Sequence, residues 1–214
     1  MKKIFATVMA LCITILTTSN IQKGHNNHSP SPSNTILNDT VELVSDSERD
    51  SIANFMIELY GLDQGIRNSD LKNRHPEIYN TVLLSTDSIT FERFISFVKR
   101  YGLPTREMMG EYYDLEPIQT LSSIIFLHNP HRLVEPETYK LLKRELANHR
   151  IKPEALAIIL DKYYVAYHNK TIYNSPFKAW TKHKGVLLSD KALSDSLLQD
   201  IGLTPLPDSV FVNE

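Results

Sequence analysis

The sequence contains one cysteine among its 214 residues, Cys12, and this residue lies near the N-terminus. Residues 1–19 have the layout of a secretory signal peptide, with Lys2 and Lys3 before an apolar run and small polar residues after it. Cleavage after Ser19 would remove the only thiol, so we expect neither disulfides nor thiolate chemistry in the mature chain. The remainder is long enough to bury a core without disulfides.

The leader has no apolar run of membrane-spanning length. Its run over residues 4–16 is interrupted by Thr7, Cys12 and Thr14, whereas a transmembrane helix needs about 20 apolar residues. A lipid anchor on Cys12 is the alternative, but a lipoprotein signal requires a small residue before the cysteine, and Leu11 stands there. We predict export to the periplasm or the extracellular space, with no transmembrane segment in the mature chain.

Basic residues are not in excess, because 23 Lys and Arg stand against 25 Asp and Glu. Loss of Lys2 and Lys3 with the leader would shift the formal charge from −2 to −4. Nucleic-acid binders carry a clustered basic face, and this sequence has none. P-loop, dinucleotide and nucleophile-elbow motifs are also missing. We therefore expect no nucleic-acid partner and no cofactor.

Residues 20–44 are rich in Asn, Ser and Pro and have little apolar content. Such a composition does not repay the entropy of ordering, so this stretch is predicted to be a flexible linker. Its two histidines, His25 and His28, are interpreted as solvated linker residues and not as metal ligands.

Apolar residues at helical spacing begin at Ser45, which is followed by acidic residues as at a helix N-terminus. The first helix carries an apolar stripe (Ile52, Phe55, Met56, Leu59 and Ile66). A second helix is predicted from near Asp87 to a stop signal at Gly102 and Pro104.

Further helices are predicted from apolar stripes and from prolines at the first helical position. The third helix covers residues 115–127, the fourth begins at Pro136, the fifth begins at Pro153, and the last covers residues 189–201. We therefore predict one domain over residues 45–204, an all-α helical bundle of about five to six helices, with a C-terminal tail over 205–214. The less regular stretch 171–184 is predicted to include a short extended segment.

The segment Leu-Asp-Gln-Gly-Ile-Arg places Asp63 and Arg67 four residues apart, so that the two side chains can pair on one helix face. Asp63 also follows Leu59 by four residues and therefore leans toward the apolar stripe. One interpretation is a structural ion pair, with Gln64 bonded to a neighbouring backbone group. The other is a functional site, because buried ionisable groups also occur where chemistry takes place.

His128 lies on the inward stripe of the third helix, at the point where Asn129 and Pro130 end it. A histidine there can act as a general base, bind a metal, or bond to a carbonyl in the core. His131 follows at a spacing of three, but Pro130 breaks the helix that would place both histidines on one face. A zinc site needs three or four convergent ligands, so no metal site is predicted.

Asp161 is a second inward-leaning acid, four residues after Ala157 in an otherwise apolar and aromatic stretch. If the helices face one another, Asp63, Arg67, His128 and Asp161 would converge into a buried polar cluster. The alternative is that each finds a local partner.

The order of these motifs resembles a bacterial family of helical domains of unknown function, often found behind signal peptides. The family pattern has an Asp-Gln-x-x-Arg helix, a Tyr-Gly-x-Pro turn, a glycine, a histidine that ends a helix, and a Leu-Ala-x-x-x-Asp-Arg segment. The matching residues here are Asp63, Gln64, Arg67, Tyr101, Gly102, Pro104, Gly110, His128, Leu156, Ala157 and Asp161. Lys162 stands where the pattern has arginine, and residues 173–176 depart from its last motif. The resemblance implies one cluster of Asp63, Gln64, Arg67, His128 and Asp161.

Three functions remain open from the sequence. The first is a domain that binds an envelope partner or a small ligand at the polar cluster. The second is a hydrolase-like enzyme in which His128, oriented by Asp63 or Asp161, acts as general base while Arg67 binds an anionic group. The third is a structural protein of the cell envelope.

Overall fold

The computed structural model describes residues 44–214, and its fold is the predicted all-α helical bundle. The signal peptide and all but the last residue of the predicted linker lie outside the described residues. The longer helices are α2 (Asp46–Asn68), α4 (Pro76–Tyr101), α6 (Glu116–His128), α7 (Pro136–Ala147), α8 (Pro153–His168) and α9 (Lys191–Asp200). Two four-residue helices are α3 (Leu71–Arg74) and α5 (Arg106–Met109). None of the described helices is long and apolar enough to cross a membrane.

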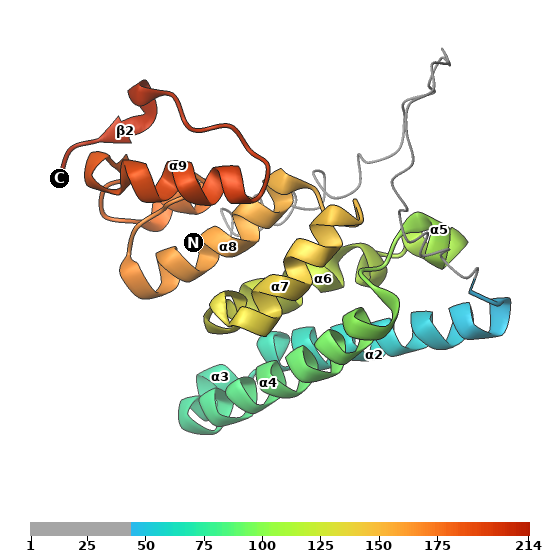
Figure 1. Cartoon of the computed structure of the whole chain (residues 1–214). Helices are drawn as coiled ribbons and strands as arrows, with labels where there is room; N and C mark the ends of the chain where they lie inside the picture. Colours follow the sequence, from blue (N-terminus) through green and yellow to red (C-terminus); the bar gives the residue numbers. More distant parts are fainter. Residues whose placement is uncertain (1–43) are drawn as a thin grey trace, which may run out of the picture.

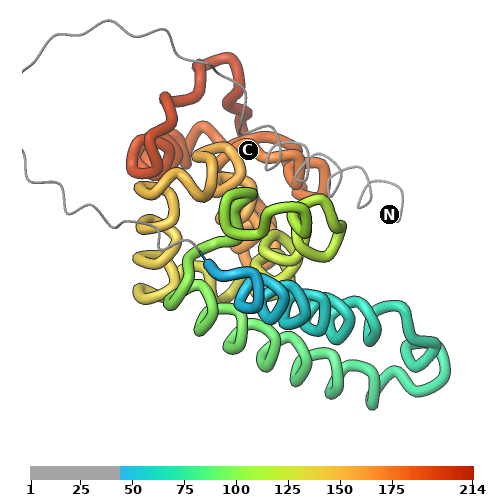
Figure 2. Tube along the Cα trace, turned by 90° about the vertical axis from the view of Figure 1, so that its right-hand side faces the viewer, coloured from blue at the N-terminus to red at the C-terminus, as the bar shows by residue number. Residues whose placement is uncertain are grey.

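Helices α2 and α4 lie side by side as a long hairpin that α3 closes (Figures 1 and 2). Ser45 caps α2 as predicted, because its side chain accepts a hydrogen bond from the Glu48 backbone N–H. The predicted start of the second helix at Asp87 is wrong, since α4 begins at Pro76. The first turns of α4 expose Ile78 (55 %) and Leu84 (70 %), and so they lack the single buried stripe by which helices are recognised.

Helix α6 packs on both helices of the hairpin and on α8, and the core is centred on its buried face. Leu121 and Ile125 of α6 are fully buried. The ring of Phe126 meets the ring of Phe94 from α4 edge to face, with 5.7 Å between centroids. This packing fixes the C-terminal end of α6 against α2 and α4.

Helices α7 and α8 begin at Pro136 and Pro153, as predicted. Between α4 and α7, Gly102 has φ of +82° and ends α4. The fully buried carboxylate of Glu145 accepts a hydrogen bond from the Leu103 backbone N–H at 2.8 Å. The Tyr-Gly-x-Pro turn is therefore held by an acid on α7.

Short 3₁₀ helices fill most connections: η1 (Gly110–Asp114), η2 (Pro130–Val134), η3 (Pro176–Trp180), η4 (Leu188–Asp190) and η5 (Asp208–Val210). The stretch 171–184, predicted to include an extended segment, contains η3, and a strand follows it. This strand, β1 (Val186–Leu187), pairs in parallel with β2 (Phe211–Val212) near the C-terminus (Figure 1). Residues 205–214, predicted as a tail, thus include η5 and β2.

Candidate functional site

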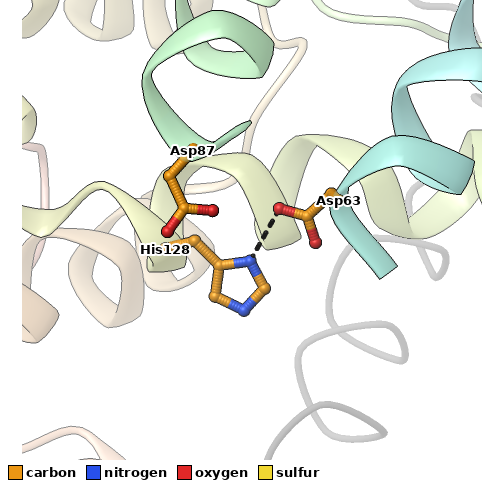
Figure 3. Close-up of side chains that lie close together, drawn as sticks. All are labelled: Asp63, Asp87 and His128. Atoms are coloured by element: carbon orange, nitrogen blue, oxygen red, sulfur yellow. Dashed lines mark hydrogen bonds and ion pairs between the residues drawn. The ribbon is translucent and has the colours of Figure 1, made fainter. Parts of the chain in front are cut away.

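The carboxylate of Asp63 is the centre of a polar network between helices α2, α4 and α6 (Figure 3). Its side chain is fully buried. The Oδ1 atom lies 3.0 Å from Nδ1 of His128 and 3.1 Å from Nη1 of Arg67. The Oδ2 atom accepts a hydrogen bond of 2.8 Å from Nε2 of Gln64. Four of the five residues predicted to cluster are therefore in contact with one another through Asp63.

Asp87 of α4 is a member of this network that the sequence did not identify. Its Oδ1 atom lies 2.6 Å from Nη2 of Arg67, so that one guanidinium bridges the carboxylates of Asp63 and Asp87. Asp87 is 8 % exposed. An aspartate in the interior of a helix would have been considered as a member of the site. The sequence pattern instead placed Asp87 at a helix start, where acidic residues are common because they interact favourably with the helix dipole.

We call Asp63, Arg67, Asp87 and His128 the charged cluster. With a neutral imidazole it contains two carboxylates and one guanidinium, and its formal charge is −1. The charge becomes zero when His128 is protonated or when the Asp87 carboxyl takes up a proton. Burial raises the pKa of Asp87 above its ordinary value, although the hydrogen bond from Arg67 acts in the opposite direction. Burial therefore disfavours the ionised form of the Asp87 carboxyl relative to that of an exposed aspartate.

The contact with Asp63 determines how the imidazole of His128 is used. An ionised carboxylate can only accept a hydrogen bond, so Nδ1 of His128 carries the proton and donates to Asp63. The lone pair of a neutral imidazole is then on Nε2. Figure 3 shows that the Nε2 edge of the ring points away from the carboxylates of both Asp63 and Asp87. The His128 side chain is 14 % exposed, so the ring is not completely sealed from solvent.

The charged cluster also includes a donor set for a metal ion. One ligand atom each from Asp63, Asp87 and His128 lie within 4.8 Å of one another. Two carboxylates and an imidazole are suitable ligands for Zn²⁺ or Mn²⁺. However, Arg67 already bonds to one oxygen of each carboxylate. Arg67 supplies the positive charge that a metal ion would bring, and a metal ion would have to compete with it.

Asp161, the fifth predicted residue, lies elsewhere and binds local partners. Its fully buried carboxylate accepts hydrogen bonds from the segment that follows α8. The donors are Thr171 Oγ1, Ser175 Oγ (2.5 Å), and the backbone N–H groups of Ile172 (2.7 Å), Tyr173 (3.0 Å) and Ser175 (3.2 Å). Both carboxylate oxygens are used in this way. The structure therefore places Asp161 as the anchor of residues 171–175 and not as a member of the charged cluster.

Two further residues that the sequence pattern singled out also lie outside the charged cluster. His131 is in η2 and is exposed. Lys162 follows Asp161, and its ammonium lies 4.9 Å from the ring centroid of Trp180 and 5.0 Å from that of Phe177. Burial lowers the pKa of Lys162. Lys162 thus contacts an aromatic surface beside η3.

Comparisons of the chain with protein-family models, with curated proteins and with solved structures found no match. The resemblance of the motif order to a bacterial family therefore stays a prediction, and the function has to be argued from the geometry of the charged cluster.

Proposed function

We propose that the charged cluster is a binding site for a small polar ligand, with which His128 exchanges a proton. The observation that carries this proposal is the 3.0 Å contact between Nδ1 of His128 and the buried Oδ1 of Asp63. It holds the ring in one orientation and one tautomer, with Nε2 directed away from the acids (Figure 3).

The exposure of the charged cluster supports a ligand that approaches from the side of His128 and Arg67. Asp63 is fully buried, whereas the side chains of His128 and Arg67 are 14 % and 19 % exposed. A ligand can reach these two side chains without displacing Asp63. A hydroxyl or acid group on the ligand fits, because it can donate a proton to Nε2. Transfer of a proton from an acid group makes the cluster formally neutral and leaves the negative charge on the ligand, beside the imidazolium.

A hydrolase-like enzyme is the second candidate, and the same contact favours it. In such an enzyme Asp63 orients His128, and Nε2 takes a proton from an attacking water. Arg67 fits the predicted role of anion binder less well, because its Nη1 and Nη2 atoms already bond to Asp63 and Asp87. Export through residues 1–19 is part of both proposals and would place the site outside the cytoplasm.

The test of the proposal uses His128→Gln, because glutamine can still donate a hydrogen bond to Asp63 but cannot exchange a proton. His131→Gln, in exposed η2, is the matched control. Small hydroxy acids, phosphate monoesters and amides are screened by thermal shift, and each ligand found is titrated by calorimetry. We expect His128→Gln to weaken binding at least about tenfold, which corresponds to 1.4 kcal/mol, and His131→Gln to leave it unchanged. Equal affinities of the wild type and His128→Gln would refute the proposal.

Nitrogen-15 NMR of the imidazole tests the geometry without a ligand. We expect neutral His128 to carry its proton on Nδ1, and Asp63→Asn to alter this preference. A neutral His128 with the proton on Nε2 would contradict both candidates. The enzyme candidate is tested separately with chromogenic esters and phosphate esters. It requires hydrolysis that the wild type and His131→Gln catalyse and that His128→Gln does not.

A further inference from the structure

The outer face of the α2–α4 hairpin carries an apolar groove of about 630 Å³. Its lining comes from these two helices alone, and α6, which packs on both of them, contributes none of it. Phe55 of α2 and Phe97 of α4 stack in the groove, with 5.6 Å between ring centroids. The hairpin lies at one edge of the molecule in both views (Figures 1 and 2), and no other described helix contributes a residue to the lining of the groove.

The groove continues along the hairpin as a regular stripe. On α2, residues at alternating spacings of three and four lie on this face, namely Glu48, Ser51, Phe55, Glu58 and Leu62. On α4 the corresponding residues are Val82, Ile89, Arg93, Ser96 and Arg100. Leu62, Val82 and Ile89 are 44 %, 40 % and 54 % exposed. Spacing of this kind is typical of the seam between packed helices, and within residues 44–214 this seam has two helices on one side and none on the other.

Four charged residues beside the stripe are acidic on α2 and basic on α4, and one further acid on α4, Glu92, also lines the groove and pairs with Arg132. The α2 side carries Glu48 and Glu58, and the α4 side carries Arg93 and Arg100. Arg93 pairs with Glu58 across the groove at 2.8 Å. Within residues 44–214, by contrast, Arg100 stacks on Tyr101 and Glu48 bonds to Ser45, and neither forms an ion pair.

We propose that this face binds a second copy of the chain, related by a twofold axis that runs along the groove. Such an axis lays α2 of one copy on α4 of the other, so that the Glu48 end of each α2 meets the Arg100 end of the partner copy's α4. Glu48 then faces the partner's Arg100, and Leu62 packs beside the partner's Ile89. The result is a four-helix arrangement with a closed apolar seam. A self-complementary surface is what a twofold dimer requires, and a groove for an unrelated partner has no reason to be self-complementary.

The first experiment compares two exposed apolar residues of α4 by sedimentation equilibrium. Ile89 lies on the stripe, whereas Leu84 is more exposed, at 70 %, and lies on a different face of the helix. We expect the wild type and Leu84→Glu to form dimers of equal affinity, and Ile89→Glu to weaken the dimer at least tenfold. Circular dichroism confirms that both variants fold. A wild type that stays monomeric at every concentration reached, or a dimer that Leu84→Glu weakens as much as Ile89→Glu, overturns the proposal.

The second experiment tests the direction of the axis by exchanging charges. Arg100→Glu and Glu48→Arg each create two like-charge contacts per dimer, and each should weaken the dimer about tenfold or more. The double variant restores opposite charges and should recover most of the lost affinity. Lys99→Glu is the control, because Lys99 is an exposed neighbour on α4 outside the groove. A double variant weaker than both single variants would show that Glu48 and Arg100 do not face each other.

Discussion

Asp63 and Asp161 are both fully buried acids, and they are satisfied by different kinds of donor. Asp161 accepts hydrogen bonds only from hydroxyl and backbone N–H groups of a nearby segment. Asp63 instead contacts a guanidinium and an imidazole, which are groups that carry or exchange charge. The first environment fixes a loop, whereas the second can respond to a proton or a ligand. This difference is why the proposed function rests on Asp63 and not on Asp161.

Asp87 allows a prediction about pH. Burial raises its pKa in the folded state above the ordinary value of 3.8. At pH values between the ordinary pKa and the raised pKa, the folded state therefore binds more protons than the unfolded state. Stability therefore falls as pH rises through this interval. Because asparagine does not titrate there, we expect the free energy of unfolding of Asp87→Asn, relative to wild type, to increase as pH rises from about 4, near the ordinary aspartate pKa. Urea denaturation at a series of pH values measures it.

Asp114→Asn is the control with the opposite sign. The hydrogen bond from Arg106 lowers the pKa of Asp114, so Asp114 contributes stability at higher pH that is lost as pH falls through its folded-state pKa. The stability of Asp114→Asn relative to wild type should therefore decrease as pH rises through the acidic range. If Asp87→Asn followed the same direction as Asp114→Asn, the pKa of Asp87 would not be raised.

At the scale of the elements, two helices are followed by a glycine with positive φ. Gly102 ends α4, and Gly202 comes shortly after α9. Gly102 and Gly202 have the same φ of +82°. A Cβ atom on Gly102 would overlap the guanidinium of Arg150, whereas one on Gly202 would meet nothing within 4 Å. We expect Gly202→Ala to cost about 1 kcal/mol from backbone strain alone. Gly102→Ala should cost about 3 kcal/mol, because its ψ of −178° at positive φ is a backbone conformation that residues other than glycine rarely adopt. Equal losses in urea denaturation would contradict this reasoning.

The ends of the helices were predictable where single residues determine them. Ser45, Pro136 and Pro153 were correctly identified as helix starts, because capping and proline geometry depend on neighbouring residues alone. The start of α4 could not be predicted in this way, because its first turns expose apolar side chains and so lack a single buried stripe. The pair of Asp63 and Arg67 could be anticipated from helical spacing, whereas their convergence with His128 was one of two open alternatives, and the set that it described wrongly included Asp161. Asp87 could not be anticipated, because its place depends on how α4 packs against α2.

At the scale of the whole molecule, two buried acids join different parts of the chain. Asp63 connects α2 to α6 directly and to α4 through Arg67. Asp161 connects α8 to residues 171–175, from which the chain leads to β1 and α9. The first acid therefore holds the helical body together, and the second holds the C-terminal part onto it.

Native-state hydrogen exchange should separate these two roles. In Asp161→Asn the amide has only one acceptor oxygen, so some of the N–H and hydroxyl donors of residues 171–175 lose their hydrogen bond. We expect the free energy of unfolding to fall by about 3 kcal/mol. We expect exchange to accelerate mainly in residues 171–201. Asp63→Asn should cost a similar amount but accelerate exchange in α2, α4 and α6 together. A uniform acceleration of every element by Asp161→Asn would show that the two parts unfold as one unit.

The partners of Asp161 also bear on the order in which the molecule folds. They lie 10 to 14 residues further along the chain, whereas Asp63 and His128 are 65 residues apart. Closing the longer loop costs about 1.7 kcal/mol more chain entropy than closing the shortest of these. Folding should therefore nucleate around α8 and the segment after it. The charged cluster, whose members come from three separate helices, should be completed in the last steps.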